Sequence, residues 1–600
     1  MCGIIGYIGE ERALPILQTG LENLEYRGYD SVGVALRGVD DLRLFKQAGR
    51  IKDLTLPDTD DATVGIGHTR WSTHGEPTDA NAHPHTDCTG TVAVVHNGII
   101  ENYDSLREEL ADHAFTSETD TEVVPHLIEE YLAEGDDLPE AVDKVLERLE
   151  GTFALGIVST DFDGIVAARQ DSPLVIGHGE TGAFIASDVT AFLEHTRDVT
   201  YVEDGDVAVL TDEGVEIRND GALVERPHEH VEWEAEAAEK SGYDHYMLKE
   251  IHEQPTALRQ TLSGRIDELN GEVDLDVDLP KEYLNSLEEV TFVACGTSYH
   301  AGLYAARLVE SLADVRASAE IASEYEFDGG RDPWRTLVVP VTQSGETADT
   351  LSALRRAKRA GARSLAVTNT LGSTVTREAD ETVFIRAGPE IGVAATKTFV
   401  SQVATLALLT VSIARARGEM STTNAIEFLG HVRQLPGAVQ KVLDEEAGFK
   451  EAASEYANGE AFFFIGRKLG YPVALEGALK LKEIAYVHAE GFAAGELKHG
   501  PLALVTPKSP VLAVLTQGSS PEATLNNVKE VESRGAPVIG CTSLDDAEKF
   551  LDVTFEMPEL GDLSPLIANV CFQLFAYHVA NLKGRSIDKP RNLAKSVTVE

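Results

Sequence analysis

A pattern of strand, loop and helix occurs twice in the second half of this chain, and no other feature restricts the fold as strongly. Residues 336–370 (TLVVPVTQSGETADTLSALRRAKRAGARSLAVTNT) match residues 511–543 in the order and register of these elements. Apolar strands that alternate with helical segments are typical of parallel α/β units, and an internal repeat indicates a duplicated domain. The pattern therefore predicts two doubly wound parallel-sheet domains (αβα, flavodoxin-like), at 285–427 and 452–585.

Length and hydropathy bound the class of protein. A chain of 600 residues is too long for one hydrophobic core, so we expect an α/β protein of two to four domains. The most apolar run, Phe399–Ala414, is short and contains Ser, Gln and Thr, which favours a buried helix over a membrane span. The first residues do not show a basic region followed by an apolar stretch, which argues against a signal peptide and predicts a cytoplasmic protein.

Charge is the unusual feature of the composition. The chain has 51 Lys and Arg against 100 Asp and Glu, a net charge of −49. Such a charge repels nucleic acids and anionic membrane surfaces, so we expect neither as a partner. The acidic residues are spread along the whole chain, which favours adaptation to a salt-rich cytoplasm where screening limits the self-repulsion.

Cys2 becomes the first residue if the initiator methionine is removed, as its small side chain permits. An α-amine titrates near pH ~7.7–8 and a thiol near ~8.5, so around neutrality the amine can take the thiol's proton. Cys2 would then be a nucleophile with its own base, although a cysteine in this position is more often a plain strand residue. Two later predicted strands end at Arg70-Trp71 and at Asn97-Gly98. Taken singly, Arg70 is most often an ion-pair partner, Trp71 a core residue and Asn97-Gly98 a turn.

Several N-terminal motifs occur together: MCGIIGYIG, LEYRGYDSVG, GHTRWSTHGEP, NAHPH, VVHNGIIEN and SETDTE. As a set they resemble the glutaminase domain of class II amidotransferases, the N-terminal-nucleophile (Ntn) hydrolases, which implies an αββα layer domain at 2–239. The resemblance implies that Cys2 attacks the side-chain amide of glutamine and that Asn97 and Gly98 form the oxyanion hole. It further implies four glutamine-binding residues: Arg70 for the carboxylate, Asp120 for the amino group, and Trp71 and His83 as pocket residues.

Histidines gather near these motifs, at His68, His74, His83 and His85. Their spacing does not fit a helical HExxH zinc site, and the hydrolytic nucleophile is already supplied. The five cysteines (Cys2, Cys88, Cys295, Cys541 and Cys571) are too scattered for a disulfide framework and contain no CxxC pair. The sequence therefore predicts neither a metal nor a cofactor.

An acidic stretch separates the two halves of the chain. Residues 211–239 read as irregular and predict the end of a domain. The segment SGYDHYMLKEIHEQP follows, within a connecting region at 240–284. Its Tyr, His, Met and Ile among charges predict a segment packed at an interface.

Two loops of the first repeat carry hydroxyl groups directly before a predicted helix. One is Cys295-Gly296-Thr297-Ser298, and the other is TQSGET at 342–347. Hydroxyls and backbone amides at a positive helix end suit a phosphate, although such loops are often only N-caps. The equivalent loop of the second repeat, QGSSP at 517–521, is less suited to bind a phosphate.

The second repeat offers titratable groups instead. Glu476, Lys480 and Glu483 fall on one helix face at i, i+4 and i+7, a spacing that by itself favours a solvated ion-pair face. His499 follows in a Gly-Pro loop, and Lys595 lies in the apolar-flanked C-terminal tail at 586–600.

Over essentially the whole chain these motifs are similar to the glutamine:fructose-6-phosphate aminotransferases, in which paired sugar-isomerase (SIS) domains follow the glutaminase domain. The resemblance implies a set of residues that hold the sugar phosphate: Thr297, Ser298, Thr342, Gln343, Ser344, Thr347, Val393, Glu476, Lys480 and Ala594. It implies an imine between Lys595 and the opened sugar, proton transfer by Glu483, and ring opening assisted by His499. Thr342 and Ala395 stand where the family usually has serine, and only Thr342 keeps the hydroxyl.

The reaction implied by the resemblance is transfer of the amide nitrogen of L-glutamine to D-fructose 6-phosphate with isomerisation, giving D-glucosamine 6-phosphate and L-glutamate. Free ammonia would mostly protonate in water, so we expect an internal passage, with Trp71 and the C-terminal tail as gate candidates. The family also implies a homodimer. Two alternatives remain open: an enzyme of the same architecture that acts on another sugar phosphate, and a sugar-phosphate sensor whose glutaminase half is inert.

The salt adaptation predicts that potassium chloride stabilises the fold. We expect the melting temperature to rise with salt concentration, because counter-ions screen the repulsion among acidic side chains. Thermal unfolding across a potassium chloride series measures this, and a melting temperature independent of salt would contradict it.

Overall fold

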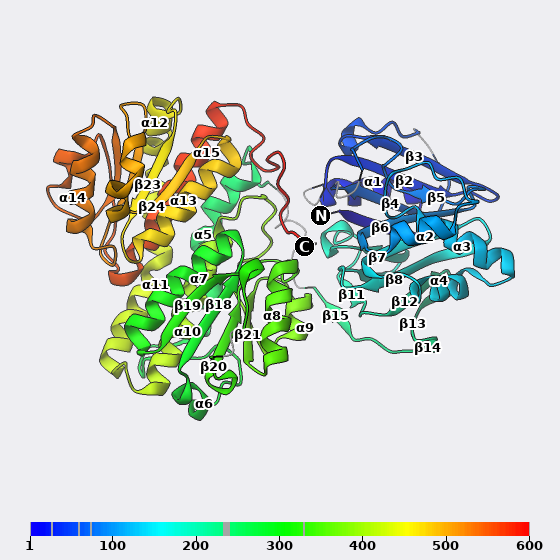
Figure 1. Ribbon diagram of the computed structural model, residues 1–600, viewed down its shortest axis with the longest axis horizontal. Helices are drawn as coiled ribbons and strands as arrows, with labels where there is room; N and C mark the ends of the chain where they lie inside the picture. The colour runs from blue at the N-terminus through cyan, green and yellow to red at the C-terminus, as the bar shows by residue number, and fades with distance from the viewer. Residues whose placement is uncertain are drawn as a thin grey trace. The chain divides into compact units, whose positions relative to one another are not determined.

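The computed structural model describes residues 2–25, 28–57, 60–71, 75–231, 240–327 and 330–598. The expected domain boundary at 239 and His74 lie outside the described residues. By its internal contacts the chain forms two compact units (Figure 1), residues 1–235 with 594–600 and residues 236–593.

The first unit contains two antiparallel sheets. The eight-stranded sheet has the order β15-β11-β9-β10-β1-β4-β2-β3, and the seven-stranded sheet has the order β14-β13-β12-β8-β7-β6-β5. The strand bounds in chain order are β1 (Gly3–Gly9), β2 (Ser31–Arg37), β3 (Leu42–Ala48), β4 (Val64–Arg70), β5 (His85–Thr86), β6 (Val92–Ile100), β7 (Gly151–Ser159), β8 (Phe162–Gln170), β9 (Val175–Gly179), β10 (Gly182–Ala186), β11 (Asp198–Tyr201), β12 (Asp206–Thr211), β13 (Gly214–Asn219), β14 (Ala222–Leu223) and β15 (His228–His230).

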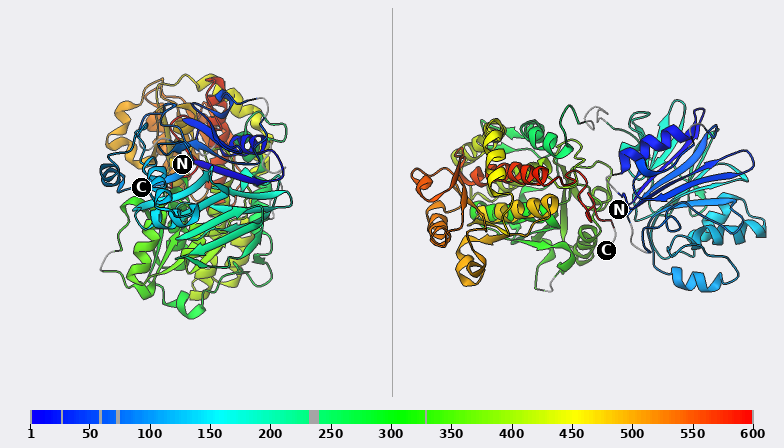
Figure 2. Two further views of the ribbon diagram at one scale, coloured as in Figure 1. Left: turned by 90° about the vertical axis from the view of Figure 1, so that its right-hand side faces the viewer. Right: turned by 90° about the horizontal axis from the view of Figure 1, so that it is seen from above.

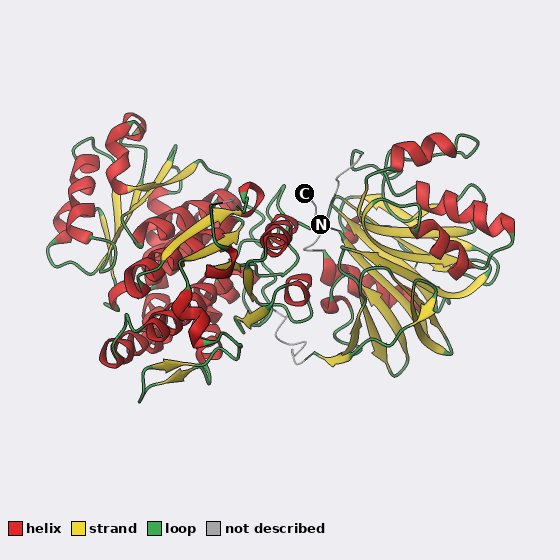
Figure 3. Ribbon diagram, turned by 60° about the horizontal axis from the view of Figure 1, so that its bottom comes forward, coloured by secondary structure: helices red, strands yellow, loops and turns green. Residues whose placement is uncertain are grey.

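The side chains of β1 alternate between two cores, because successive residues of a strand point to opposite faces. Ile4 and Ile8 join the core between the two sheets, whereas Ile5 and Tyr7 pack with helix α1 on the outer face. The helices of this unit are α1 (Ala13–Leu24), α2 (Tyr103–Glu109), α3 (Val123–Glu134) and α4 (Leu138–Leu146). Helices α2, α3 and α4 share a core with the outer face of the second sheet. The four layers (Figures 2 and 3) confirm the predicted αββα fold.

The expectation of an irregular stretch at 211–239 is wrong for its described part. Strands β13, β14 and β15 lie within residues 214–230; β14 and β15 are the edge strands of the two sheets, and β13 pairs with β14. They are short and most of their side chains are exposed or half-buried, so the apolar pattern by which a strand is recognised in a sequence is weak here.

The second unit contains two five-stranded parallel sheets with identical topology. Their orders are β19-β18-β20-β21-β22 and β24-β23-β25-β26-β27, each of which is the 2-1-3-4-5 order of flavodoxin-like folds. The strand bounds are β18 (Glu289–Ala294), β19 (Arg316–Ile321), β20 (Thr336–Pro340), β21 (Arg363–Thr368), β22 (Glu381–Phe384), β23 (Phe462–Gly466), β24 (Ala489–Ala493), β25 (Val511–Leu515), β26 (Val538–Thr542) and β27 (Val553–Glu556), and a small hairpin is formed by β16 (Ile266–Asp267) and β17 (Glu272–Val273). The shared strand order confirms the duplicated parallel-sheet fold.

Helices lie on both sides of each sheet (Figure 3). Their bounds are α5 (Tyr246–Leu262), α6 (Lys281–Ser286), α7 (Gly296–Ala313), α8 (Ala348–Ala360), α9 (Thr374–Glu378), α10 (Lys397–Arg417), α11 (Thr422–Asp444), α12 (Glu446–Tyr456), α13 (Gly470–Ala485), α14 (Pro521–Glu532) and α15 (Ser564–Leu582). Among the described residues, α10 and α15 are long and apolar enough to cross a membrane, but both are largely buried against α7 and α13. The prediction of a buried helix at Phe399–Ala414 is therefore confirmed.

Helix α5 packs against α10, α11 and α15, as expected for a segment at an interface. It buries Met247 and Ile251 completely. The carboxylate of Asp588 accepts hydrogen bonds from the backbone amides of Tyr246 and Met247, at 3.0 and 2.9 Å, and thereby caps the first turn of the helix. The chain after α15 is thus fastened to the segment that precedes the repeated domains.

Candidate active sites

Strand pairing brings Cys2 to the residues that follow β4. Strands β1 and β4 are antiparallel, with Gly3 opposite Thr69, so the residue before β1 lies at the end of β4. The backbone amide of Trp71 donates a hydrogen bond to Cys2 Sγ at 3.2 Å. The Trp71 ring in turn contacts Tyr29 edge to face, with 5.8 Å between ring centroids.

Asn97 reaches the same place from the other sheet. Its side-chain amide nitrogen donates a hydrogen bond to the backbone oxygen of Cys2 at 3.0 Å. The interpretation of Asn97-Gly98 as a strand end or turn is wrong, because β6 continues to Ile100 and pairs Asn97 with Ala154. Sequence reasoning expected the glycine to stop the strand, but here the inter-strand pairing continues past it.

Gly98 has a backbone conformation that only glycine adopts easily, with φ of 138°. A Cβ at this position would lie 1.9 Å from the backbone oxygen of Thr152. Only glycine therefore fits at this position, directly after Asn97, whose side chain contacts Cys2.

His68 is a residue that the sequence analysis did not include in the site. Its Nε2 lies 2.9 Å from the His96 carbonyl oxygen and 3.1 Å from Asn97 Oδ1, so this nitrogen carries the proton and donates to both oxygens. Burial lowers the pKa of His68 to about 3, which keeps the ring neutral. By holding Asn97 Oδ1, His68 turns the amide nitrogen of Asn97 toward Cys2. The signal in the sequence is the spacing of His68 and Arg70, which places both on one face of β4.

His83 supports this arrangement from behind. Its ring stacks on His68 with 4.2 Å between centroids, and its Nδ1 accepts a hydrogen bond from the His96 amide. Burial holds the pKa of His83 and of its neighbour His85 well below the usual range. The structure thus places His83 in contact with the residue that orients Asn97.

Arg70 and Asp120 bring opposite charges to the Cys2 site. Both side chains are buried, and Asp120 Oδ2 accepts the Ile100 amide hydrogen at 2.8 Å. Burial lowers the pKa of the Arg70 guanidinium, whereas the neighbouring Cys2 and Asp120 act in the opposite direction. A cation and an anion beside one nucleophile fit the carboxylate and the ammonium group of a free amino acid.

Burial raises the pKa of the Cys2 thiol, and the Trp71 amide and the Arg70 guanidinium oppose this effect. The thiol is therefore protonated at neutral pH and needs a base before it can attack. An α-amine on Cys2 itself is a base of suitable strength.

In the second unit, the two hydroxyl-rich loops follow neighbouring strands. Thr297 and Ser298 lie in the first turn of α7, after β18, and residues 342–347 connect β20 to α8. Because β18 and β20 are adjacent and parallel, both loops lie at one edge of the sheet, where its topology reverses.

The 342–347 loop is held by its own polar groups. Thr342 Oγ1 lies 3.1 Å from Thr347 Oγ1 and accepts the Gly345 amide hydrogen at 3.2 Å. Ser344 Oγ accepts the Glu346 amide hydrogen, and the backbone oxygen of Gln343 accepts the Asn369 amide hydrogen. The loop is a preformed turn of hydroxyls and amides before α8, as a phosphate requires.

A buried ionic cluster joins the two repeated domains. Lys480 Nζ lies 3.3 Å from Glu476 Oε1 and 2.6 Å from Glu483 Oε2, and it donates a hydrogen bond to Thr297 Oγ1 of the first domain at 3.1 Å. The side chains of Lys480 and Glu476 have no exposed surface. The prediction of a solvated ion-pair face, which rested on spacing alone, is therefore wrong, because α13 packs on α7 and removes Glu476 and Lys480 from water.

Lys480 and Glu476 stay charged in this setting. Burial works against the charge of Lys480, but Glu476 and Glu483 outweigh it and raise the lysine pKa. The Glu476 pKa is lowered, since Lys480, His300 and Thr297 together exceed the effect of burial.

Two further residues of the first domain were missed by sequence reasoning. His300 Nδ1 lies 2.7 Å from Glu476 Oε2, and Gln402 Nε2 donates a hydrogen bond to Ser298 Oγ at 2.9 Å. His300 stands two residues after Ser298 on α7, and Gln402 lies in the buried helix α10. Neither belongs to a motif, so only the fold reveals them.

The remaining predicted residues are more dispersed. Val393 is buried, and its backbone amide donates a hydrogen bond to the backbone oxygen of Asp588 at 3.0 Å. His499 is exposed at the end of a short 3₁₀ helix, and none of its described contacts joins it to Glu483. Ala594 and Lys595 are half-buried and group with the first unit, so their roles at the sugar stay predictions.

The buried cluster predicts a large effect of removing Lys480. Lys480→Ala leaves the fully buried carboxylate of Glu476 without its lysine partner, and we expect the unfolding free energy of the second unit to fall by about 3–5 kcal/mol. Urea unfolding measures the change. The matched control is Lys482→Ala on the exposed side of the same helix, which we expect to cost less than about 0.5 kcal/mol. Equal stability of the two variants would contradict a buried ionic cluster.

Family models match both parts of the chain. Residues 283–412 and 455–582 match the SIS domain, and residues 68–194 match a glutamine amidotransferase domain. Among solved structures, the C-terminal domain of glucosamine-fructose-6-phosphate aminotransferase from Francisella tularensis is 39% identical with a TM-score of 0.55, covering 59% of this chain and 100% of that chain.

Similar curated proteins extend over the full length. A glutamine–fructose-6-phosphate aminotransferase [isomerizing] from Halobacterium salinarum is 63% identical, and proteins of the same name from Methanosarcina acetivorans and Thermus thermophilus are each 48% identical. In every case the match covers 100% of both chains. This chain therefore belongs to the glutamine–fructose-6-phosphate aminotransferase (isomerizing) family.

Proposed function

We propose that this protein transfers the amide nitrogen of L-glutamine to D-fructose 6-phosphate and isomerises the product to D-glucosamine 6-phosphate, releasing L-glutamate. The observation that carries the proposal is the convergence of Trp71 and Asn97 on Cys2, in a chain whose second unit has a preformed hydroxyl loop. Full-length relatives that bear this enzyme name support the same reaction.

The first half-reaction takes place at Cys2. The α-amine of Cys2 takes the thiol proton, and Sγ attacks the side-chain carbonyl of glutamine. Asn97 Nδ2 and the Gly98 amide stabilise the oxyanion, and His68 keeps the Asn97 amide turned toward the nucleophile. The α-ammonium group then gives its proton to the amide nitrogen, so that ammonia leaves as the thioester forms, and attack by water releases glutamate and restores the thiol.

Arg70 and Asp120 select the substrate of this step. The planar guanidinium of Arg70 binds the α-carboxylate, and Asp120 binds the α-ammonium group. An amide that lacks these groups would forgo both charge-assisted contacts, which disfavours it as a substrate.

The second half-reaction combines ammonia with fructose 6-phosphate and releases water. Thr297, Ser298 and the 342–347 loop bind the phosphate, and His499 assists opening of the sugar ring. Lys595 forms an imine with the opened sugar, and ammonia displaces the lysine. Glu483 then moves a proton from C1 to C2, a role that its contact with Lys480, which also binds Thr297, supports.

The transfer of ammonia inside the protein, the homodimer and the cytoplasmic location stay part of this proposal. Ammonia released into water at neutral pH would mostly become ammonium, which is not a nucleophile. Internal transfer therefore accounts for the presence of a glutaminase and a sugar-phosphate domain pair in one chain.

The two half-reactions predict reciprocal effects of two variants. Cys2→Ala should abolish glutamine hydrolysis and glutamine-dependent synthesis but keep the interconversion of fructose 6-phosphate and glucose 6-phosphate. Lys595→Ala should abolish synthesis and borohydride trapping of the sugar but keep glutamine hydrolysis. Assays of glutamate, glucosamine 6-phosphate and glucose 6-phosphate measure all three activities.

The same assays separate the alternatives. Synthesis from another ketose or aldose phosphate in preference to fructose 6-phosphate would show that the acceptor is a different sugar phosphate. Sugar-phosphate binding by wild-type protein without any glutamine hydrolysis would indicate a sensor. Equal loss of both half-reactions in Cys2→Ala would contradict the assignment of Cys2 to glutamine alone.

A further inference from the structure

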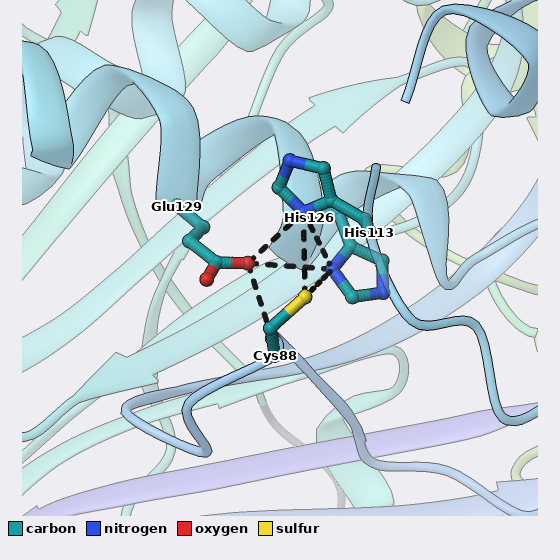
Figure 4. A group of neighbouring side chains, drawn as sticks. All are labelled: Cys88, His113, His126 and Glu129. Carbon is teal, nitrogen blue, oxygen red and sulfur yellow. Dashed lines mark hydrogen bonds and ion pairs between the residues drawn. The ribbon is translucent and has the colours of Figure 1, made fainter. Parts of the chain in front are cut away.

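Four side chains of the first unit converge outside the Cys2 site. Cys88 lies in the loop between β5 and β6, His113 follows α2, and His126 and Glu129 lie one turn apart on α3. One potential ligand atom from each residue lies within 4.8 Å of the others. Figure 4 shows the sulfur, two ring nitrogens and one carboxylate oxygen pointing toward a common centre.

Five of the six separations among these atoms are close to the edges of a metal tetrahedron, and the sixth, between Cys88 Sγ and Glu129 Oε2, is within 4.8 Å. Cys88 Sγ is 3.5 Å from the Nδ1 atoms of both His113 and His126. The two Nδ1 atoms are 3.2 Å apart, and Glu129 Oε2 is 3.1 and 3.4 Å from them. With Zn–N near 2.0–2.1 Å and Zn–S near 2.3 Å, tetrahedral ligand atoms lie about 3.3–3.6 Å apart.

Hydrogen bonds alone do not account for this convergence. Each Nδ1 atom has three close polar neighbours, yet a ring nitrogen carries either one proton or one lone pair. At most one neighbour of each nitrogen can be satisfied by a directed hydrogen bond, whereas one cation at the centre would accept a lone pair from all four atoms.

Backbone amides contact two of the four potential ligand atoms. The Ala114 amide donates a hydrogen bond to Cys88 Sγ at 3.4 Å, and the Cys88 amide donates to Glu129 Oε2 at 3.1 Å. Backbone donors that approach ligand atoms from outside are typical of metal sites, because they hold the ligands in place.

We propose that Cys88, His113, His126 and Glu129 bind a zinc ion. One thiolate, two imidazoles and one carboxylate are a ligand set for zinc, and four protein ligands close the tetrahedron. A closed site is structural, so the ion would not take part in glutamine hydrolysis. Sequence reasoning missed it because the ligands span 42 residues with no CxxC or HExxH spacing.

The ion would fasten the segment that carries Asp120. Residues 114–122 lie between the ligands His113 and His126, and in this segment Asp120 binds the Ile100 amide while Thr121 Oγ1 lies 2.8 Å from His96 Nδ1. Cys88 connects the start of β6, the strand of Asn97, to the same point. The zinc would therefore hold two parts of the glutamine pocket together.

The direct test is metal content and cobalt spectroscopy on the full-length protein without a histidine tag. We expect about one zinc per chain by elemental mass spectrometry after growth with zinc. Cobalt added to the metal-free protein should give the visible bands of tetrahedral Co²⁺ and a thiolate charge-transfer band in the near ultraviolet.

Cys88→Ser and His126→Gln should each lower the bound zinc at least tenfold, and Cys88→Ser should remove the thiolate band. The matched controls are Cys295→Ser and His230→Gln, which change the same residue types away from the cluster and should keep the full zinc content. Metal content at background in the wild type, or zinc retained equally in the cluster variants, would overturn the proposal.

Thermal unfolding of the wild-type protein gives a second test of zinc binding. A chelator should lower the melting temperature of the wild-type first unit, and added zinc should restore it. Cys88→Ser, if folded by circular dichroism, should not respond to either treatment. An identical response of Cys88→Ser and wild type would also contradict a zinc site at this cluster.

Discussion

The arrangement of the second unit depends on the ion pairs and the hydrogen bond that hold the buried ammonium group of Lys480. A charge without contact to water is tolerated only when other groups replace its hydration, and Glu476, Glu483 and Thr297 do so here. Lys480, Glu476 and Glu483 come from the second repeat, and Thr297 comes from the first. The ion cluster therefore fixes the register of α13 on α7 and, with it, the position of Glu483 relative to Thr297.

A comparable constraint organises the first unit. The antiparallel register of β1 and β4 sets Cys2 against Trp71, and β6 of the facing sheet brings Asn97 to the same point. The neutral His68 between the sheets joins them, because it holds the amide of Asn97. Rigid strands, rather than loops, thus position Cys2 and the side-chain amide of Asn97, which suits a preorganised site.

Local patterns and the family resemblance were sufficient for the fold, and they pointed to Cys2 and Asn97, which the fold brings into contact. The repeated strand and helix pattern predicted two parallel sheets, and the resemblance carried by the motifs around Cys2 and Arg70 implied the αββα domain. Burial and long-range contacts were not accessible in this way. The spacing of Glu476 and Lys480 is the same on a solvated helix as on a buried one, and only the packing of α7 distinguishes them. For the same reason His68, His300 and the Cys88 cluster became evident only when distant segments met.

The central claim is that nitrogen moves from glutamine to a sugar phosphate within one protein. The most direct measurement is the mass of the hexosamine phosphate formed from fructose 6-phosphate and glutamine labelled with heavy nitrogen in its side-chain amide, in the presence of excess unlabelled ammonium. We expect glucosamine 6-phosphate that carries the label despite the competing ammonium. Unlabelled glucosamine 6-phosphate, or labelled ammonium released without amino sugar, would contradict it.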